Sequence, residues 1–132
     1  MEAVILHKDL EKFSMTYNHM YALLHVKIKS NAKFTGHDSI ELMHEVEEFV
    51  GNRPHKALIE VGKFITSSDE ARKKYSESLY IRYYRKADAF IVTSMFTRLL
   101  INSFISFAKP KIPIRAFANQ ADALRWLDEI SI

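Results

Sequence analysis

Apolar and polar positions follow two different periods along this chain. Phe13, Met15 and Tyr17 occupy every second position, which predicts a half-buried strand. More continuous apolar runs predict buried strands, over residues 21–28, 55–62, 86–94 and 112–119. Apolar residues three and four positions apart predict helices, over residues 36–50, 68–83, 95–108 and 120–130. After an initial strand pair, the chain therefore alternates helices with strands.

The order of these elements predicts an α/β fold. Strands that alternate with helices form a mainly parallel sheet, because each helix carries the chain back to the same edge. The first strand is expected to form a hairpin with the second and to run antiparallel to the rest. We expect a mixed, mostly parallel five-stranded sheet with helices on its faces, in a single domain over residues 1–132. Residues 3–7 fit either another strand or an N-terminal extension.

The helix expected over residues 36–50 has clear ends. Thr35 lies three residues before Asp38, which resembles a helix cap followed by a first-turn acid. Gly51 is a natural stop. Ile40 and Val46 are among the apolar residues at helical spacing, so we expect them to face the core.

Composition narrows the class of protein. The chain has 132 residues, of which 48% are hydrophobic and 27% charged, as in ordinary globular domains. It contains no cysteine, which removes disulfides, thiolate nucleophiles and cysteine-based zinc sites. The N-terminal residues do not read as a signal peptide, and the apolar stretch near Leu99 is too short and polar to span a bilayer. We expect a cytoplasmic protein without membrane insertion.

The formal net charge of +3 is unevenly distributed, at −1 over residues 1–66 and +4 over residues 67–132. Residues 72–86 interleave basic side chains with tyrosines, a mixture that could stack on single-stranded nucleic acid. Tyrosines on an amphipathic helix more often form a half-buried core edge or a subunit contact. The second interpretation is favoured, which leaves a homodimer open and makes nucleic acid the weaker hypothesis.

Three stretches together carry a family resemblance: "FITSSDEAR", "ADAFIVTSMFTRLLINSFISFAKPKIPIRAF" and "ADALRWL". They resemble the small bacterial SpoIIAA-like proteins, which are related to the STAS/SEC14 fold. The resemblance covers residues 34–127 and implies that fold. Most such proteins have no established activity, so the resemblance implies little chemistry.

Ser67 and Ser68 have two interpretations. Related anti-sigma-factor antagonists carry a phosphorylatable serine at this place, so the resemblance implies a candidate phosphosite or partner contact. Thr66 and Asp69 depart from that motif, where the family has Asp and Gly. Ser67 also stands three residues before Glu70, which predicts a capping box at the start of a helix. The cap is the favoured interpretation.

Motifs for catalysis and cofactors are missing. His37, Glu41, His44 and Glu48 share one face of a predicted helix, but a third distant metal ligand is not evident. That face is interpreted as solvated. The sequence contains neither a GxSxG elbow nor the GxGxxG and GxxxxGK phosphate loops. We therefore expect no catalytic residue, no metal site and no cofactor.

The apolar helix over residues 95–108 offers a further possibility. Asn102 is expected to be buried there and to need a hydrogen-bond partner. The apolar residues of the helix are interpreted first as ordinary core. The resemblance to SEC14 also suggests that they line an apolar pocket, at Phe96, Leu100, Phe104 and Phe107.

Polar residues after the strands mark the candidate site. Ligands bind open α/β sheets at the carboxyl ends of the strands. We expect that rim to combine Ser67 and Ser68 with Thr66, Thr93, Ser94 and Asn119. The sequence predicts a non-catalytic regulatory or protein-interaction module. The alternative is a binding protein for a lipid or small apolar ligand, which predicts a closed pocket of about 300 Å³ or more.

Overall fold

A six-stranded mixed sheet forms the centre of the molecule. The computed structural model describes residues 5–108 and 111–132. The strands are arranged in the order β1-β2-β3-β5-β7-β8, namely Ile5–Asp9, Phe13–Asn18, Leu23–Ile28, His55–Val61, Arg85–Ile91 and Ile114–Phe117. The two pairings among β1, β2 and β3 are antiparallel, and the three that follow are parallel. A mixed sheet that is mainly parallel was predicted, and it is confirmed.

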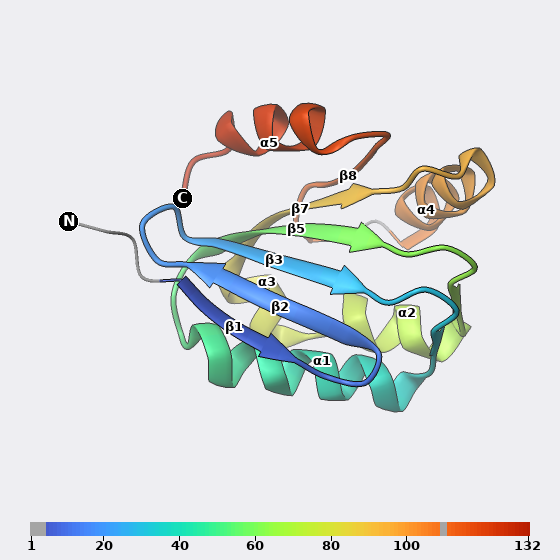
Figure 1. Cartoon of the computed structure of the whole chain (residues 1–132), viewed down its shortest axis with the longest axis horizontal. Coiled ribbons are helices and arrows are strands. Elements are labelled where there is room, and N and C mark those ends of the chain that lie inside the picture. The colour runs from blue at the N-terminus through green and yellow to red at the C-terminus, as the bar shows by residue number, and fades with distance from the viewer. Residues whose placement is uncertain (1–4, 109–110) are drawn as a thin grey trace.

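Helices cover both faces of this sheet (Figure 1). In that view α1 and α2 lie below the sheet, α3 lies behind its strands and α5 lies above it, while α4 lies near the ends of β5 and β7. Their bounds are Gly36–Val50, Asp69–Ser76, Leu79–Tyr84, Met95–Ala108 for α4, and Gln120–Asp128 for α5. The short strands β4 (Lys33–Phe34) and β6 (Thr66–Ser67) form a separate parallel pair.

Two apolar layers hold the sheet between its helices. In β2, Phe13, Met15 and Tyr17 are fully buried and pack toward α1, as their alternation predicted. On the other face, Ala87 and Ala89 of β7 form a second cluster with residues of α5. Such small side chains allow a helix to approach a strand closely. The two layers exclude water from most of both faces of the parallel strands.

Local capping explains why α1 has its predicted bounds. The Thr35 hydroxyl accepts a hydrogen bond from the Asp38 amide at 3.3 Å, and the Asp38 carboxylate accepts one from the Thr35 amide at 2.8 Å. This capping box satisfies donors that the first turn leaves free. At the other end Gly51 has a φ of 79°, a left-handed conformation that glycine adopts without strain.

The structure corrects four details of the prediction. The sheet has six strands rather than five, because Ile5–Asp9 pairs along β2. The helix expected over residues 68–83 is divided into α2 and α3, because the Ser78 hydroxyl accepts from the Ile81 amide and begins a new helix. Ile40 is exposed rather than buried, since Leu42, Val46 and Val50 form the core face of α1. Asn102 is exposed too, so it needs no buried partner.

No helix within the described part of the chain is both long enough and apolar enough to cross a membrane.

Candidate functional site

A large cavity lies where the parallel strands end. It has a volume of about 1410 Å³ and is open to solvent. Its floor includes Ile28 of β3, Val61 of β5 and Phe90 of β7, and residues of α2 and α4 contribute to its walls. Typical small-molecule sites enclose about 300–1,000 Å³, so this cavity exceeds the usual range. The size expected for a binding protein is present, but the cavity is an open cleft rather than a closed pocket.

The wall of the cavity is mainly apolar. The described apolar residues that line it come from strands, loops and helices, namely Ile28, Phe34, Leu42, Ile59, Val61, Phe64, Ile65, Ala71, Phe90, Val92, Phe96 and Ile101. Apolar wall that faces water is unfavourable by roughly 25 cal/mol per Å². A ligand with an apolar part would therefore be stabilised by covering this wall.

The structure brings together four of the six residues predicted at the rim. Thr66, Ser67, Thr93 and Ser94 all line the cavity. Parallel strands end at one edge of the sheet, so Thr93 and Ser94, which come just after β7, meet Thr66 and Ser67 of β6, which the chain reaches through the loop after β5.

The other two predicted rim residues are helix caps. The Ser68 hydroxyl accepts a hydrogen bond from the Ala71 amide at 3.0 Å and caps α2. Asn119 accepts from the Asp122 amide at 2.9 Å and caps α5, and it does not appear among the described lining residues. Their side chains are therefore engaged in helix termini.

Ser67 contacts an arginine instead of capping a helix. Arg72 donates from Nη1 to the Ser67 carbonyl at 2.7 Å and to its Oγ at 2.8 Å, and it also forms an ion pair with Asp69. Glu70 lies close to Gly36, so that a methyl group on that glycine would collide with it. The predicted capping box between Ser67 and Glu70 is therefore wrong, because the chain enters α2 one residue later.

The predicted apolar positions of α4 are only partly described. Phe96 lines the cavity and is 70% exposed. The side chains of Leu100, Phe104 and Phe107 lie outside the described part of the structure. Thr97 and Ile101 of the same helix line the cavity. The helix thus borders the cavity along its first turns.

A buried polar network lies beneath α2, and sequence analysis did not anticipate it. Arg85 and Asp88 of β7 form an ion pair in which Nη1 donates to Oδ1 at 2.5 Å, and both residues are fully buried. The Tyr75 hydroxyl donates to the other oxygen of Asp88. Arg85 Nε donates to His55 Nε2 at 2.8 Å, while His55 Nδ1 donates to the Arg53 carbonyl at 2.8 Å.

Burial and charge set the protonation states in this network. Burial, followed by the nearby Arg85 guanidinium, lowers the pKa of His55 from 6.5 to about 4. His55 is therefore neutral near pH 7, which suits its role as an acceptor. Burial also raises the pKa of the Tyr75 hydroxyl, and the Asp88 carboxylate adds to the shift. The network is closed on itself and holds α2 against β7.

One signal in the sequence could have pointed to this network. Asp88 interrupts the apolar run of a strand that was predicted to be buried. A buried carboxylate needs a cationic partner, and Arg85 lies three residues before it. The contribution of Tyr75 and His55 depends on how distant segments pack.

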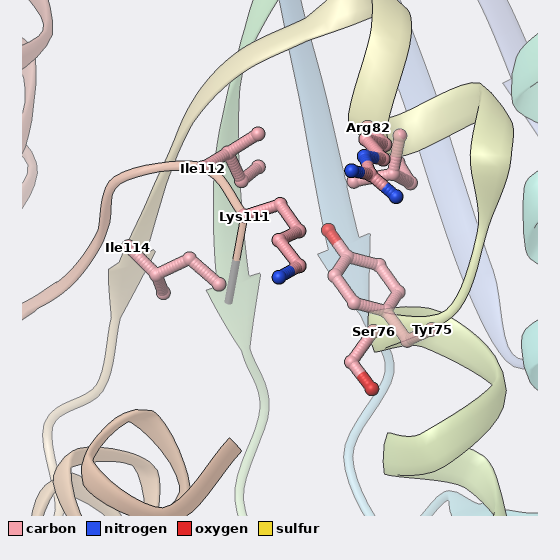
Figure 2. Close-up of a pocket in the computed structure, with 7 residues that line it drawn as sticks. Tyr75, Ser76, Arg82, Lys111, Ile112 and Ile114 are labelled. Carbon is pink, nitrogen blue, oxygen red and sulfur yellow. The ribbon is translucent and has the colours of Figure 1, made fainter. Parts of the chain in front are cut away.

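A second pocket lies on the other side of Tyr75 (Figure 2). Its volume is about 20 Å³, and Arg82, Lys111 and Ile114 are among the residues that line it. The Tyr75 hydroxyl points between the side chains of Lys111 and Arg82 in this view. That volume holds little more than one water molecule, so this pocket is too small for an organic ligand.

The exposed face of α1 shows one weak pairing. His44 Nε2 and Glu48 Oε1 lie 3.3 Å apart, one helical turn from each other. Among the described residues there is no group of three His, Asp or Glu side chains that could hold a metal ion. The described residues of this face therefore do not form a metal site.

A model of a protein family, described as a domain of unknown function (DUF7793), matches residues 18–131. The chain belongs to this family. The structure is also similar to a solved one, that of an uncharacterised protein of the DUF3478 family from Shewanella loihica PV-4, which has a SpoIIAA-like fold. The two share 20% sequence identity, with a TM-score of 0.56 over 95% of this chain and 93% of the other.

This similarity shows the fold alone, and the predicted SpoIIAA-like fold is confirmed. No curated protein matches the sequence. In this DUF7793 protein, the physical features of the site are an apolar cleft, hydroxyl groups at its rim, and the cationic side chains of Lys63, Arg72 and Lys73 in its wall.

Proposed function

We propose that this protein is a non-catalytic binding protein for a small amphipathic molecule with a long apolar part. The observation that supports this most directly is the cavity of about 1410 Å³ with its mainly apolar wall. The strands beneath it are fixed by two packed layers, so the cavity floor is preformed. Preformed sites bind more tightly, because little ordering is needed on association.

The arrangement of polar groups suggests how such a ligand would lie. The floor at Val61 and Phe90 would contact the apolar part, since it is the region beneath the sheet's carboxyl edge. Hydroxyl groups of Thr66 and Thr93 stand at the rim, where a polar end would reach solvent. The ligand class is therefore an amphiphile rather than a pure hydrocarbon.

The titratable groups in the described wall favour binding over turnover. Asp69 is paired with Arg72, and both side chains reach solvent. The Tyr75 hydroxyl is occupied by Asp88, and its raised pKa keeps it protonated. General acid–base catalysis needs a group whose pKa lies near the working pH. These features support a role without chemistry.

A regulatory protein-interaction module is the second candidate. Ser67 is exposed, and Arg72 already donates to its hydroxyl group. A phosphate on Ser67 would gain a charge-assisted hydrogen bond from that guanidinium, although Asp69 would oppose it. Phosphosite mapping of the protein from its native cells, together with recovery of a bound partner, distinguishes this candidate from the first.

A binding titration tests the first proposal. A fluorescent long-chain fatty acid is titrated into the purified full chain, and its emission is measured. Wild type should bind it saturably with micromolar affinity. Replacing Thr97 with Trp should weaken binding at least about tenfold, because the larger side chain occupies the space beside α4.

A matched variant controls for nonspecific effects of the added indole. Thr16→Trp places the same side chain on β2, whose Thr16 lies outside the cavity wall. It should bind the probe as wild type does, and circular dichroism should show both variants folded. Wild type that binds neither this fatty acid nor an uncharged alkyl glycerol probe would overturn the proposal.

A further inference from the structure

Large apolar side chains face water at and beside the opening of the cavity: Phe64 and Phe96 line it, and Met95 and Leu99 are exposed on the same turns of α4 as Phe96. Phe64 is 82% exposed in the loop between β5 and β6. Met95, Phe96 and Leu99, in the first turns of α4, are 69%, 70% and 60% exposed. Phe64 and Phe96 both line the cavity, so the two segments border the same opening. Figure 1 shows the loop after β5 and the helix α4 at the end of the molecule where β3 and β5 terminate. We call these four residues the apolar mouth.

The backbone holds Phe64 outward against its own preference. Its φ is 58°, in the left-handed region that is sterically unfavourable for a bulky residue. Strained conformations of this kind persist where the surrounding structure imposes them, and they are concentrated at functional sites. The neighbouring Ile65 is partly buried in the cavity wall. The loop thus turns one apolar residue inward and displays the other.

The charge beside the apolar mouth is positive. Lys63 precedes Phe64, and Lys73 lies on α2 in the same cavity wall. Neither forms an ion pair with any residue that the structure describes. The nearby acid Asp69 is already paired with Arg72. Two cations without an ion-pair partner among the described residues therefore line the same cavity as the exposed Phe64 and Phe96.

Exposed Phe, Leu and Met side chains flanked by lysine have the chemistry of a peripheral membrane contact. Apolar groups enter the boundary between headgroups and acyl chains, while lysines are attracted to anionic lipids. The helix α4 suits this contact, because among the described residues it contacts chiefly β8, and its first turns are exposed. A protein partner would not require cations at the opening of an apolar cleft.

We propose that the apolar mouth docks onto the surface of an anionic lipid bilayer. Phe64 and the first turns of α4 would lie at the headgroup level, with Lys63 and Lys73 against anionic headgroups. The cavity would then open toward the lipid, where amphipathic molecules are dissolved. This inference rests on the proposed function, because docking delivers the cavity to its source of ligand.

Vesicle sedimentation tests the docking. The purified full chain is mixed with vesicles of phosphatidylcholine alone, or with vesicles in which about 30 mol% of the lipid is phosphatidylglycerol. The phosphatidylglycerol gives the second kind of vesicle a negatively charged surface. Wild type should sediment with the anionic vesicles, and less so at high salt because salt screens charge. Phe64→Asn should weaken this binding at least about fivefold.

The variant was chosen so that loss of binding cannot be attributed to unfolding. Asparagine adopts the left-handed conformation more readily than phenylalanine does, so Phe64→Asn should keep or raise the melting temperature. Tyr83→Gln is the matched control, since Tyr83 is comparably exposed on α3 at the other end of the strands. It should bind vesicles as wild type does. The double variant Lys63→Gln, Lys73→Gln should lose the preference for anionic vesicles.

The outcomes separate the two proposals. Wild type that fails to bind anionic vesicles, or Phe64→Asn that binds as wild type, overturns the docking. If the fatty acid still binds in solution, only the docking is overturned, and the apolar mouth would then suit a protein partner. If vesicle binding depends on Phe64 but the fatty acid does not bind, the docking surface is retained and the proposed ligand is overturned.

Discussion

A single buried carboxylate organises the polar interior beneath α2. Asp88 accepts from Arg85 with one oxygen and from Tyr75 with the other, so its charge is compensated in two directions. Removing one partner of a buried ion pair leaves the other charge buried without compensation. The free energy of unfolding then falls by about 3–5 kcal/mol. Tyr75 is also part of the cavity wall. This network therefore fixes one side of the candidate site.

The neutrality of His55 predicts how stability depends on pH. The pKa of this buried imidazole is about 4 in the folded protein and 6.5 as its ordinary value. Between these pH values the unfolded chain binds a proton that the folded protein excludes. The free energy of unfolding should therefore fall as pH decreases below 6.5, by about 2 kcal/mol by pH 5. Urea unfolding at pH 7 and pH 5 measures this change.

A variant assigns the effect to that residue. His55→Gln keeps a donor and an acceptor but does not titrate, so its loss of stability between pH 7 and pH 5 should be smaller by about that amount. The comparison cancels the exposed histidines, which both proteins share. Equal pH dependence in the two proteins would show that the His55 imidazole is free to protonate in the folded state.

Among single residues, the sequence predicted several of those at the rim of the cavity but not the partners of the buried Asp88. Thr66 and Thr93 could be placed together because they follow two parallel strands, and the topology alone brings strand ends to one edge. The partners of Asp88 could not be identified in that way. Tyr75 and His55 lie 13 and 33 residues from it, and their meeting depends on helix packing and strand register.

At the scale of one element, the junction between β6 and α2 allows the contributions of two adjacent serines to stability to be compared. The Ser68 hydroxyl caps α2, whereas the Ser67 hydroxyl contacts the exposed Arg72. Ser68→Ala should therefore lower the free energy of unfolding by about 1 kcal/mol. Ser67→Ala should change it by less than about 0.5 kcal/mol. Chemical denaturation of the two variants measures both values.

The reverse ranking would restore the capping box that the sequence suggested. The two serines are adjacent and chemically identical, but only Ser67 has an acidic residue three positions later, since Glu70 follows it there and Ala71 follows Ser68. The position at which the backbone turns helical nevertheless makes Ser68 the cap. That turn follows the pairing of β6 with β4, in which the Ser68 amide donates to the Phe34 carbonyl at 3.0 Å.

Local signals decided which elements could be predicted with correct bounds. The helix α1 has a capping box at Thr35 and a glycine after Val50, and its predicted and observed ranges agree. The segment over residues 68–83 has continuous helical periodicity, so the sequence did not indicate that a second helix, α3, begins after Ser78. Residues 3–7 fit either a strand or an N-terminal extension by sequence, because the pairing of Ile5–Asp9 depends on β2 and has no local signal.

Stability should be unevenly distributed over the whole molecule. The central strands β5 and β7 are hydrogen-bonded on both sides and covered by helices on both faces. Among the residues that the structure describes, α4 contacts chiefly β8, which lies at the sheet's edge, and Met95, Phe96 and Leu99 in its first turns are exposed. Segments with few buried apolar contacts open locally at low free-energy cost. The wall formed by α4 should therefore be the most mobile border of the cavity.

Hydrogen–deuterium exchange measures this distribution directly. Amides in β5 and β7 should exchange most slowly, near the rate of global unfolding, and amides in α4 should exchange faster than those in α1 or α5. Adding the fluorescent fatty acid should slow exchange over the first turns of α4, because the ligand supplies apolar contacts that the sheet does not provide there. Exchange over α5 serves as the internal control, since its core face packs in the second apolar cluster and none of its residues lines the cavity. Protection of α4 equal to that of β5 without ligand would mean that the cavity has a rigid wall, and it would contradict the expected mobility of α4.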